Sequence, residues 1–358
     1  MSITFRDILN QKTWNRYEDY IAEGIPQYSK ELTNDISEGR KHKKQIRDYL
    51  EKHFEIKIIS SDLNNEKELL TKGEVVGIDG TIATHKTITG TMAQLGVVAV
   101  NYLNEKIQHS YFISEARYKE DIKDVAEYLY AHEPINKVVS NPVLRAALQV
   151  RERELGLIDK FKQKYKMYHG PLVPFEMVAN PGRAELKILD VTLEILEKII
   201  ANKKCFSIVS RSQNDAYIRI GLSLNKGEYV QLKKSVGLEM MEDRTLLKEK
   251  DKWREDDYLS VNNFVNLKAT KIKIGLIKIS QRPYVFQAHE EIFDLAARII
   301  YRDALFQKEK GFPLLIDYAD NLCSTFFKAS DFNKIIEYQL AKEGEYLSET
   351  SEDNLRQK

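Results

Sequence analysis

The sequence is short of several features that would define a class of function. Its 358 residues include only two cysteines, Cys205 and Cys323, which excludes a disulfide framework and predicts reduced core residues. Lysine and arginine number 55 and aspartate and glutamate 54, so the net charge is +1. That balance excludes a globally basic nucleic-acid coat but is compatible with a local basic groove.

Long apolar runs are also missing. The longest, Leu95 to Val100, is far shorter than the ~18 residues that a membrane span needs. The N-terminus carries Asp7 and has no apolar segment of the kind that a secretory signal requires. We therefore expect a cytoplasmic protein without a membrane segment. With 42% hydrophobic and 30% charged residues, the composition is that of an ordinary folded chain.

Three stretches differ in texture. Residues 1–72 are highly charged and predict a helical N-terminal extension, with a basic run at residues 38–45 that is typical of a solvated helix face. Residues 73–343 alternate between strand-like and helix-like segments and predict one α/β domain. Residues 344–358 are polar and predict a disordered tail.

The α/β region opens with three expected strands, 73–80, 92–103 and 108–114, which predict a meander. A helix is expected from Asn141 to about Tyr165, because Asn-Pro fits a helix start. Further on we expect, in order, a strand at 168–174, a helix at 184–202, a strand at 205–210, a hairpin over 215–232 through Asn225-Lys226-Gly227, strands at 270–279 and 284–287, and helices at 289–307, at 317–327 and after residue 331.

No Gly-rich phosphate loop, dinucleotide fingerprint, nucleophile elbow or paired-cysteine metal motif occurs. Instead, carboxylates and one histidine stand near expected element ends. Asp79 closes the first strand, Glu152 and Glu154 lie on the first long helix, His169 ends a later strand, and Asp320 follows a strand-like run. Acids that converge from separate elements are what hard divalent cations need for phosphodiester cleavage. The set therefore predicts a metal-dependent hydrolase site.

Each of these residues also has a structural interpretation. Asp79-Gly80 is first of all a turn signal, and His169 before Gly-Pro is a common structural hydrogen-bonder. The two glutamates stay open: helical phase places Glu154 inside the apolar arc that should face the sheet and Glu152 on the solvated side.

Three segments resemble the NurA family of nucleases. Residues 75–81 resemble the family's first strand, which ends in Asp-Gly-Ser; residues 151–157 and then 168–174 resemble its Glu-bearing helix and the strand that ends in Asp-Gly-Pro-Leu; residues 310–315 with Ala319-Asp320 resemble its terminal Gly-Tyr-Pro segment followed by Ala-His. The three occur in the family's order, from about residue 73 to 325. The resemblance implies an α/β fold with an RNase H-like mixed central sheet flanked by helices, and a metal-dependent deoxyribonuclease that acts on DNA ends or single strands.

The resemblance also implies residue roles. Asp79, His169, Asp320 and one of Glu152 and Glu154 would be catalytic, with Asp79, His169 and either glutamate as metal ligands; the family's spacing favours Glu152. His169 stands where the family has Asp, and Asp320 where it has His, so an exchange of Asp and His keeps the ligand inventory nearly constant. Imidazole suits Mn²⁺ better than Mg²⁺, which makes Mn²⁺ the expected cofactor and Mg²⁺ the second choice.

Two further positions are expected to contact DNA. Arg211 stands near the family's Lys and could clamp a phosphate, and Phe312 replaces the family's Tyr and, with Tyr168, could stack on bases.

The family's partners follow as expectations too. A HerA-type hexameric ATPase would work with a homodimer of this protein, in DNA end processing or in antiviral (anti-phage) defence. The altered motif residues leave an alternative, an inactive NurA-like adaptor that binds the ATPase or DNA without cutting.

Overall fold

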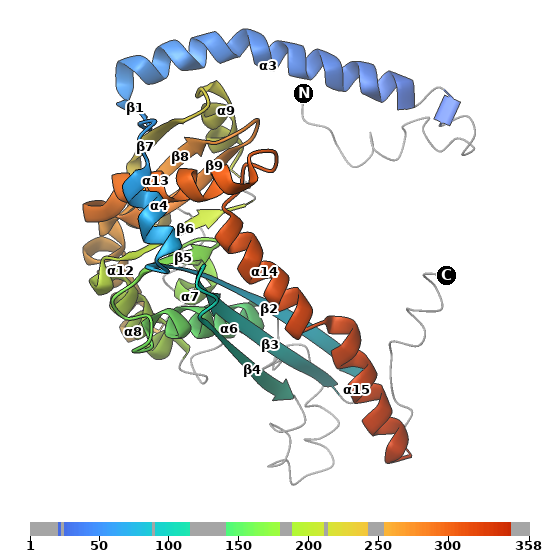
Figure 1. The fold of residues 1–358 in the computed structure, drawn as a ribbon. Helices are drawn as coiled ribbons and strands as arrows, with labels where there is room; N and C mark the ends of the chain where they lie inside the picture. The colour runs from blue at the N-terminus through green and yellow to red at the C-terminus, as the bar shows by residue number, and fades with distance from the viewer. Residues whose placement is uncertain are drawn as a thin grey trace. The chain divides into compact units, whose positions relative to one another are not determined.

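The computed structural model describes residues 21–22, 25–87, 90–114, 141–179, 188–210, 214–242 and 254–344. Internal contacts divide the chain into two compact units, Met1–His53 and Phe54–Lys358. The first unit contains the 29-residue helix α3 (Ile25–His53) (Figure 1). Its last turn carries Lys52 and His53, and cations are favoured at a helix C-terminus.

The second unit is built around one sheet. In the described part of the chain its nine strands occur in the order β1-β7-β8-β9-β6-β5-β2-β3-β4 (Figure 1). The strands are β1 (Ile56–Ile58), β2 (Val75–Thr87), β3 (Gly90–Val100), β4 (Lys106–Ser114), β5 (Tyr165–His169), β6 (Cys205–Val209), β7 (Glu228–Ser235), β8 (Ile272–Lys278) and β9 (Pro283–His289).

The sheet is mixed. β5 is parallel to both of its neighbours, β2 and β6, and every other pairing is antiparallel. The expected meander is confirmed, because β2, β3 and β4 pair consecutively. The expected mixed central sheet flanked by helices is confirmed as well.

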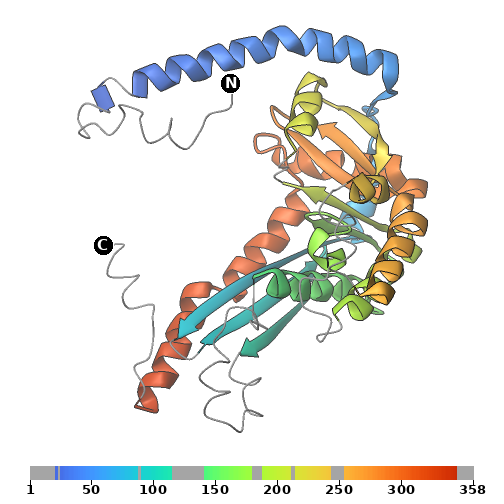
Figure 2. The same cartoon turned by 180° about the vertical axis from the view of Figure 1, so that it is seen from behind.

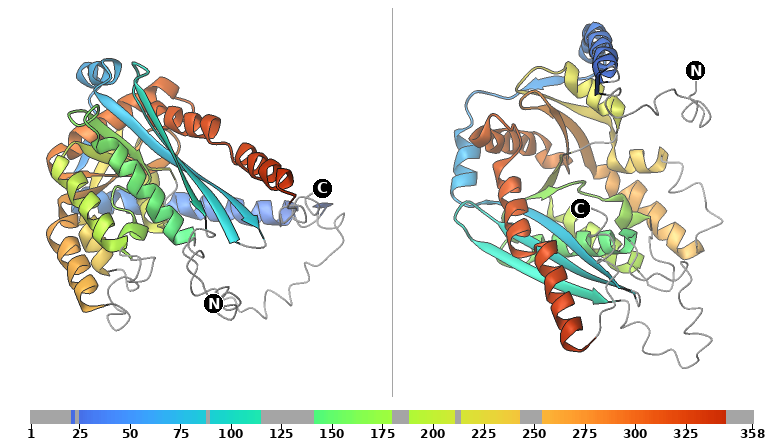
Figure 3. Two further views of the ribbon diagram at one scale, coloured as in Figure 1. Left: turned by 90° about the horizontal axis from the view of Figure 1, so that it is seen from below. Right: turned by 90° about the vertical axis from the view of Figure 1, so that its right-hand side faces the viewer.

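Helices cover both faces of the sheet. The longer ones are α4 (Asn64–Thr71), α6 (Asn141–Leu157), α8 (Ile188–Asn202), α9 (Asp215–Ser223), α12 (Glu255–Leu267), α13 (Phe293–Ala304), α14 (Leu314–Phe326) and α15 (Ala329–Lys342); the shorter ones are α7 (Phe175–Val178), α10 (Val236–Glu242) and three 3₁₀ turns at Ala269–Lys271, Glu290–Ile292 and Leu305–Gln307. Figure 3 shows β2, β3 and β4 between α6 on one side and α14 with α15 on the other.

The larger core lies on the α13 and α14 face. On α13 the apolar positions Phe293, Ala296, Ala297 and Ile300 recur at helical spacing and are buried. They belong to one cluster with apolar residues of β2, β3, β5, β6, β8, β9 and α14. On the opposite face Leu144 of α6 packs against Ala93 and Leu95 of β3. Figure 2 shows α6, in green, beside the strands of the meander. Burial on both faces explains why the central strands are rich in Val, Ile and Phe.

Three expectations differ from the structure. The hairpin over 215–232 is wrong, because Asp215–Ser223 is the helix α9. The first strand does not end at Asp79, since β2 runs on to Thr87 while paired with β3. The helix expected from Asn141 to about Tyr165 ends at Leu157.

The second compact unit begins at Phe54, ahead of residue 73, where we expected the α/β domain to start. The reason is that β1 pairs with β7 and α4 packs against α13, so both elements belong to the sheet unit. The expected tail from residue 344 lies outside the described residues except for Gly344.

Both cysteines are free and buried, as expected. None of the described helices combines the length and apolar character needed to cross a membrane.

Candidate functional site

The candidate site lies where β5 stops and its neighbour β2 continues. β2 pairs with β5 only from Val75 to Ile78, the last residue opposite Tyr168. Asp79 is the next residue of β2 and keeps only its pairing with β3, while His169 is the last residue of β5. The carboxyl end of a parallel strand is where α/β folds commonly place functional groups, because a crevice opens there.

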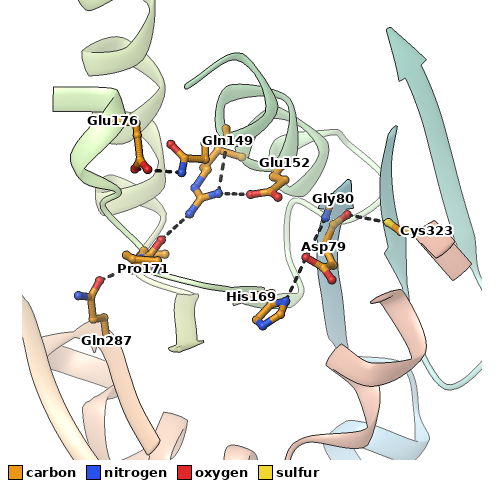
Figure 4. A network of polar contacts seen from close by, with 11 residues as sticks. Asp79, Gly80, Gln149, Glu152, His169, Pro171, Glu176, Gln287 and Cys323 are labelled. Atoms are coloured by element: carbon orange, nitrogen blue, oxygen red, sulfur yellow. Dashed lines mark hydrogen bonds and ion pairs between the residues drawn. The ribbon is translucent and has the colours of Figure 1, made fainter. Parts of the chain in front are cut away.

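Asp79 and His169 contact each other at this point. The His169 Nδ1 lies 3.2 Å from the Asp79 Oδ1 (Figure 4). The same Oδ1 accepts the backbone N–H of Gly80 at 2.9 Å. On its other side, the His169 Nε2 lies 2.9 Å from the Ser210 Oγ, and its ring lies edge-on to Phe312 with 5.8 Å between centroids. The imidazole is therefore oriented from three directions.

Glu152 approaches this strand end from α6, the helix on the face of the sheet opposite to α14. Its side chain is buried, with 6% of the residue exposed. One oxygen, Oε2, accepts a hydrogen bond from the buried guanidinium of Arg153, and the other faces Gly80. Burial raises the Glu152 pKa to about 7; Arg153 opposes that rise and the charge of Asp79 adds to it.

Asp320 completes the group from α14. This helix is tied to β2 by the Cys323 Sγ, which donates to the backbone oxygen of Asp79 at 3.3 Å (Figure 4). Asp320 lies one helical turn before Cys323 and is exposed. Partial burial and the charge of Asp79 raise the Asp320 pKa.

All three carboxylates affect the pKa of His169. Burial by itself lowers the pKa of this imidazole, but the hydrogen bond and charge of Asp79, together with the charges of Glu152 and Asp320, outweigh burial and raise the pKa. Of the predicted residues, Asp79 and His169 are in direct contact; Glu152 of α6 faces Gly80, the residue after Asp79, and Asp320 of α14 lies one helical turn before the Cys323 that bonds the Asp79 backbone.

Glu154 does not join them. Its carboxylate pairs with Arg151 at 2.5 Å on the helix surface, where 35% of the Glu154 side chain is exposed. The helical-phase interpretation was wrong because α6 packs against the sheet and also against α7 and α8. Its buried sector therefore extends beyond the apolar arc and includes Glu152, Arg153 and Gly156.

Of the residues predicted to contact DNA, the structure describes Phe312 and Tyr168 but not Arg211. Arg211 lies outside the described residues. Phe312 is only 5% exposed and packs between His169 and Tyr284, so its ring supports the imidazole and has no face free for a base. Tyr168 is fully buried and is likewise not a stacking platform.

Sequence reasoning missed Arg153 and Gly80. A signal for Gly80 was present, since residues 81–87 continue with Thr, Ile, Ala and His in strand-like character after Asp79-Gly80. A glycine inside a strand marks a close approach of another group more often than a turn. Arg153 gave no comparable signal, because it stands among charged neighbours in a helix.

The donor set fits a divalent cation in its chemistry. Two carboxyls with raised pKa values, Glu152 and Asp320, lie beside a third, Asp79, which is the situation that a shared cation relieves. The missing side chain of Gly80 leaves the room that one oxygen of Glu152 occupies. Within the ranges that the structure describes, however, no three His, Cys, Asp or Glu side chains are already grouped as an ion site. Asp79 instead engages His169, and Glu152 engages Arg153.

Three solved structures of NurA proteins are similar to this chain. The NurA nuclease from Sulfolobus solfataricus has a TM-score of 0.54 at 13% identity, covering 90% of this chain and 98% of that one. A NurA structure with manganese gives 0.50 at 12% identity, covering 89% and 98%. A NurA structure bound to dAMP and manganese gives 0.51 at 10% identity, covering 88% and 96%. The likeness to the NurA fold is thus confirmed over nearly the whole chain.

In sequence, no protein-family model matches the chain. No curated protein matches it either. At 10–13% identity, the structural likeness establishes the fold.

Proposed function

We propose that this protein is a metal-dependent deoxyribonuclease of the NurA type that cleaves phosphodiester bonds at DNA ends or in single strands. One observation carries the proposal: Asp79 and His169 contact each other where β5 ends, with Glu152 against Gly80 and Asp320 one turn from the Cys323 that bonds the Asp79 backbone. They do so in a fold similar to that of NurA structures, one of which is described as bound to dAMP and manganese.

The four side chains would hold the cation. When bound there, a divalent ion supplies Lewis-acid polarisation of the scissile phosphate and a nucleophilic hydroxide. Asp79 is central, since it contacts His169 and affects the pKa values of both Glu152 and Asp320. His169 must give up its proton before its nitrogen can act as a ligand, so cation binding at this site should strengthen with rising pH.

Manganese is the proposed cofactor, with magnesium as the second choice. Imidazole suits Mn²⁺ better than Mg²⁺, so His169 favours manganese over magnesium. The manganese in two of the similar NurA structures supports the same choice.

Replacement of Asp79 tests the enzyme hypothesis. Asp79→Ala removes the contact with His169 and the oxygen nearest to the other carboxyls, so Mn²⁺-dependent cleavage of single-stranded and end-bearing DNA should disappear. Circular dichroism and thermal melting should show a folded protein, because the strand pairings of β2 are backbone bonds. Wild-type cleavage by a folded Asp79→Ala protein would discard the mechanism.

An inactive adaptor is the second candidate. Two contacts favour it: Glu152 is paired with Arg153 and Asp79 is in contact with His169, so these proposed ligands already engage protein groups. The adaptor would bind DNA or the ATPase without cutting. A cleavage assay with purified protein across Mn²⁺ and Mg²⁺ concentrations separates the two: DNA binding with no product at any concentration would establish the adaptor.

The partners follow from the resemblance to NurA. We expect a homodimer that works with a HerA-like hexameric ATPase in DNA end processing or anti-phage defence. Co-purification of such an ATPase with the tagged protein from its native host, with light scattering for the oligomeric state, tests both. A monomer that retains no ATPase would remove this part of the proposal and leave the nuclease itself untouched.

A further inference from the structure

We propose that Arg153 and Gly80 are positioning residues for Glu152. Arg153 holds one oxygen of the Glu152 carboxylate, and Gly80 leaves the room that the other oxygen occupies. Neither residue touches substrate or cation; both determine where Glu152 can present an oxygen. The consequence for cation binding rests on the function proposed above, whereas the placement of Glu152 does not.

Arg153 is almost completely buried, with only 1% of it exposed, which is unusual for an arginine on a helix. Its Nη1 donates to the Glu152 Oε2, and its Nη2 donates to the backbone oxygen of Pro171 at 2.5 Å (Figure 4). The Nη1 also lies 3.5 Å from the backbone oxygen of Gln149. The guanidinium carbon lies 5.1 Å from the centre of the Tyr168 ring. The guanidinium is thus fixed from several sides at once.

These contacts join two parts of the site. Glu152 and Gln149 belong to α6, whereas Pro171 lies two residues after His169, in the segment that leaves β5. That segment is held from the far side too, since the backbone N–H of Leu172 donates to the Gln287 Oε1 at 2.8 Å (Figure 4). Arg153 therefore couples the helix that carries Glu152 to the strand end that carries His169. A planar two-sided donor is required for this, which lysine lacks.

Gly80 acts from the strand side. It pairs with Val97 in the middle of the β2–β3 ladder, and it is not among the described glycines with a positive φ, so its backbone does not need glycine. A Cβ at this position, however, would lie 2.7 Å from the Glu152 Oε1 and 2.8 Å from a methyl carbon of Leu148. The space that a side chain would fill is taken by the Glu152 carboxylate.

The two oxygens of Glu152 are consequently distinct. Oε2 is committed to Arg153, and Oε1 is turned toward β2 at Gly80. Partners that orient a ligating carboxylate typically change metal affinity or activity by about 10–100-fold when removed. We expect an effect of that size from Arg153→Gln, which deletes the charge and the fork, and from Gly80→Ala, which deletes no functional group.

The first experiment measures Mn²⁺ binding by isothermal titration in the absence of DNA. Arg153→Gln and Gly80→Ala should each weaken binding by about 10–100-fold, and Arg153→Lys should not restore it, because the charge is kept but the fork is lost. Arg151→Gln is the matched control: it removes a partly exposed arginine from the same helix and should bind Mn²⁺ as the wild type does. Wild-type affinity in both Gly80→Ala and a folded Arg153→Gln would overturn the proposal.

The second experiment reads the position of Glu152 directly. Crystal structures of metal-free Arg153→Gln and Gly80→Ala should show the Glu152 carboxylate displaced from its place beside β2. An unmoved carboxylate in both variants would overturn the proposal whatever the enzyme does. If the wild type neither binds Mn²⁺ nor cleaves DNA, the proposed function fails, and these structures still decide the role of Arg153 and Gly80. Should Arg153→Gln not fold, Gly80→Ala alone decides.

Discussion

Two buried carboxyl groups of this molecule, Glu152 and Asp303, share an electrostatic property and differ in surroundings. Burial raises the pKa of each to about 7. Asp303 is fully buried, and each of its oxygens accepts from a neutral donor: Oδ1 from the Tyr102 hydroxyl, and Oδ2 from the backbone N–H of Leu315 at 2.9 Å. Glu152 has one oxygen on Arg153 and the other turned toward Gly80.

The difference teaches how to separate a structural acid from a candidate ligand. Asp303 has a donor on each oxygen; it joins α13 to Tyr102, two residues after the end of β3, and to the first turn of α14. Glu152 accepts from a charged donor, Arg153, and its Oε1 lies where the missing side chain of Gly80 leaves room. A perturbed pKa marks both residues, so it cannot by itself identify a functional site; the proposed role of Glu152 rests on the place of its Oε1 beside Gly80.

The largest expected effect is on catalysis. Glu152→Gln keeps the shape of the side chain but removes the charge that a cation needs, so kcat should fall by at least about 10³-fold, because a metal contributes several kcal/mol of transition-state stabilisation. Single-turnover cleavage of a labelled oligonucleotide measures it. Asp303→Asn should stay within about tenfold of the wild type under conditions where it is folded; equal losses in the two variants would break the comparison.

The next effect is on stability and concerns Asp303. Asp303→Ala leaves the Tyr102 hydroxyl and the Leu315 N–H without an acceptor, at a cost of about 1–3 kcal/mol for each orphaned donor. Urea denaturation followed by circular dichroism gives the free energy of unfolding. Tyr102→Phe is the milder companion, since it removes one hydrogen bond and leaves the carboxyl bonded to Leu315. An unchanged stability of Asp303→Ala would show that this network does not hold α14.

A pH series sharpens the comparison further. The Asp303 pKa is raised from 3.8 to about 7, so the native state binds this proton more tightly than the unfolded chain does. Its contribution to stability is therefore fully present below pH 3.8 and is lost as the pH rises through 7. The free energy of unfolding of the wild type should fall relative to that of Asp303→Asn between pH 4 and pH 7.5. A constant difference across that range would contradict the shift.

The smallest effect is expected at Glu154. Its ion pair with Arg151 is partly exposed, with 42% of the arginine side chain and 35% of the glutamate accessible, and such pairs contribute below about 1 kcal/mol. Glu154→Gln should therefore leave both cleavage and Mn²⁺ binding at wild-type levels. A loss of cleavage comparable to that of Glu152→Gln would restore Glu154 as a candidate ligand.

Sequence patterns predicted most of the central sheet. Runs of β-branched and apolar residues predicted the meander of β2, β3 and β4 and the later strands β6, β8 and β9, most of which are largely buried, whereas β5 spans Tyr165–His169 and only its end falls in the strand expected at 168–174. The hairpin over 215–232 failed although its turn is real: Gly227 has φ +83° and precedes β7. The missed signal was Asn214, whose side chain accepts from the backbone N–H groups of Ala216 and Tyr217 and starts α9.

The sequence pointed to the residues of the candidate site more clearly than to their arrangement in space. Asp79, His169 and Asp320 are recognisable because they stand beside short motifs. The choice of Glu152 over Glu154 depends on packing from α7 and α8, which periodicity along one helix does not contain. The same is true of Arg153, since its partners at Pro171 and Glu152 belong to different elements.

The unequal lengths of β5 and β2 have a thermodynamic consequence. Because β5 stops at His169 while β2 continues to Thr87, β2 has no β5 partner beyond Ile78, and α6 and α14 both pack against β2. An ion bound there would cross-link α6, β2 and α14, so its binding free energy would add to the resistance of the entire sheet unit to unfolding. Occupancy of the site and global stability would then rise and fall together.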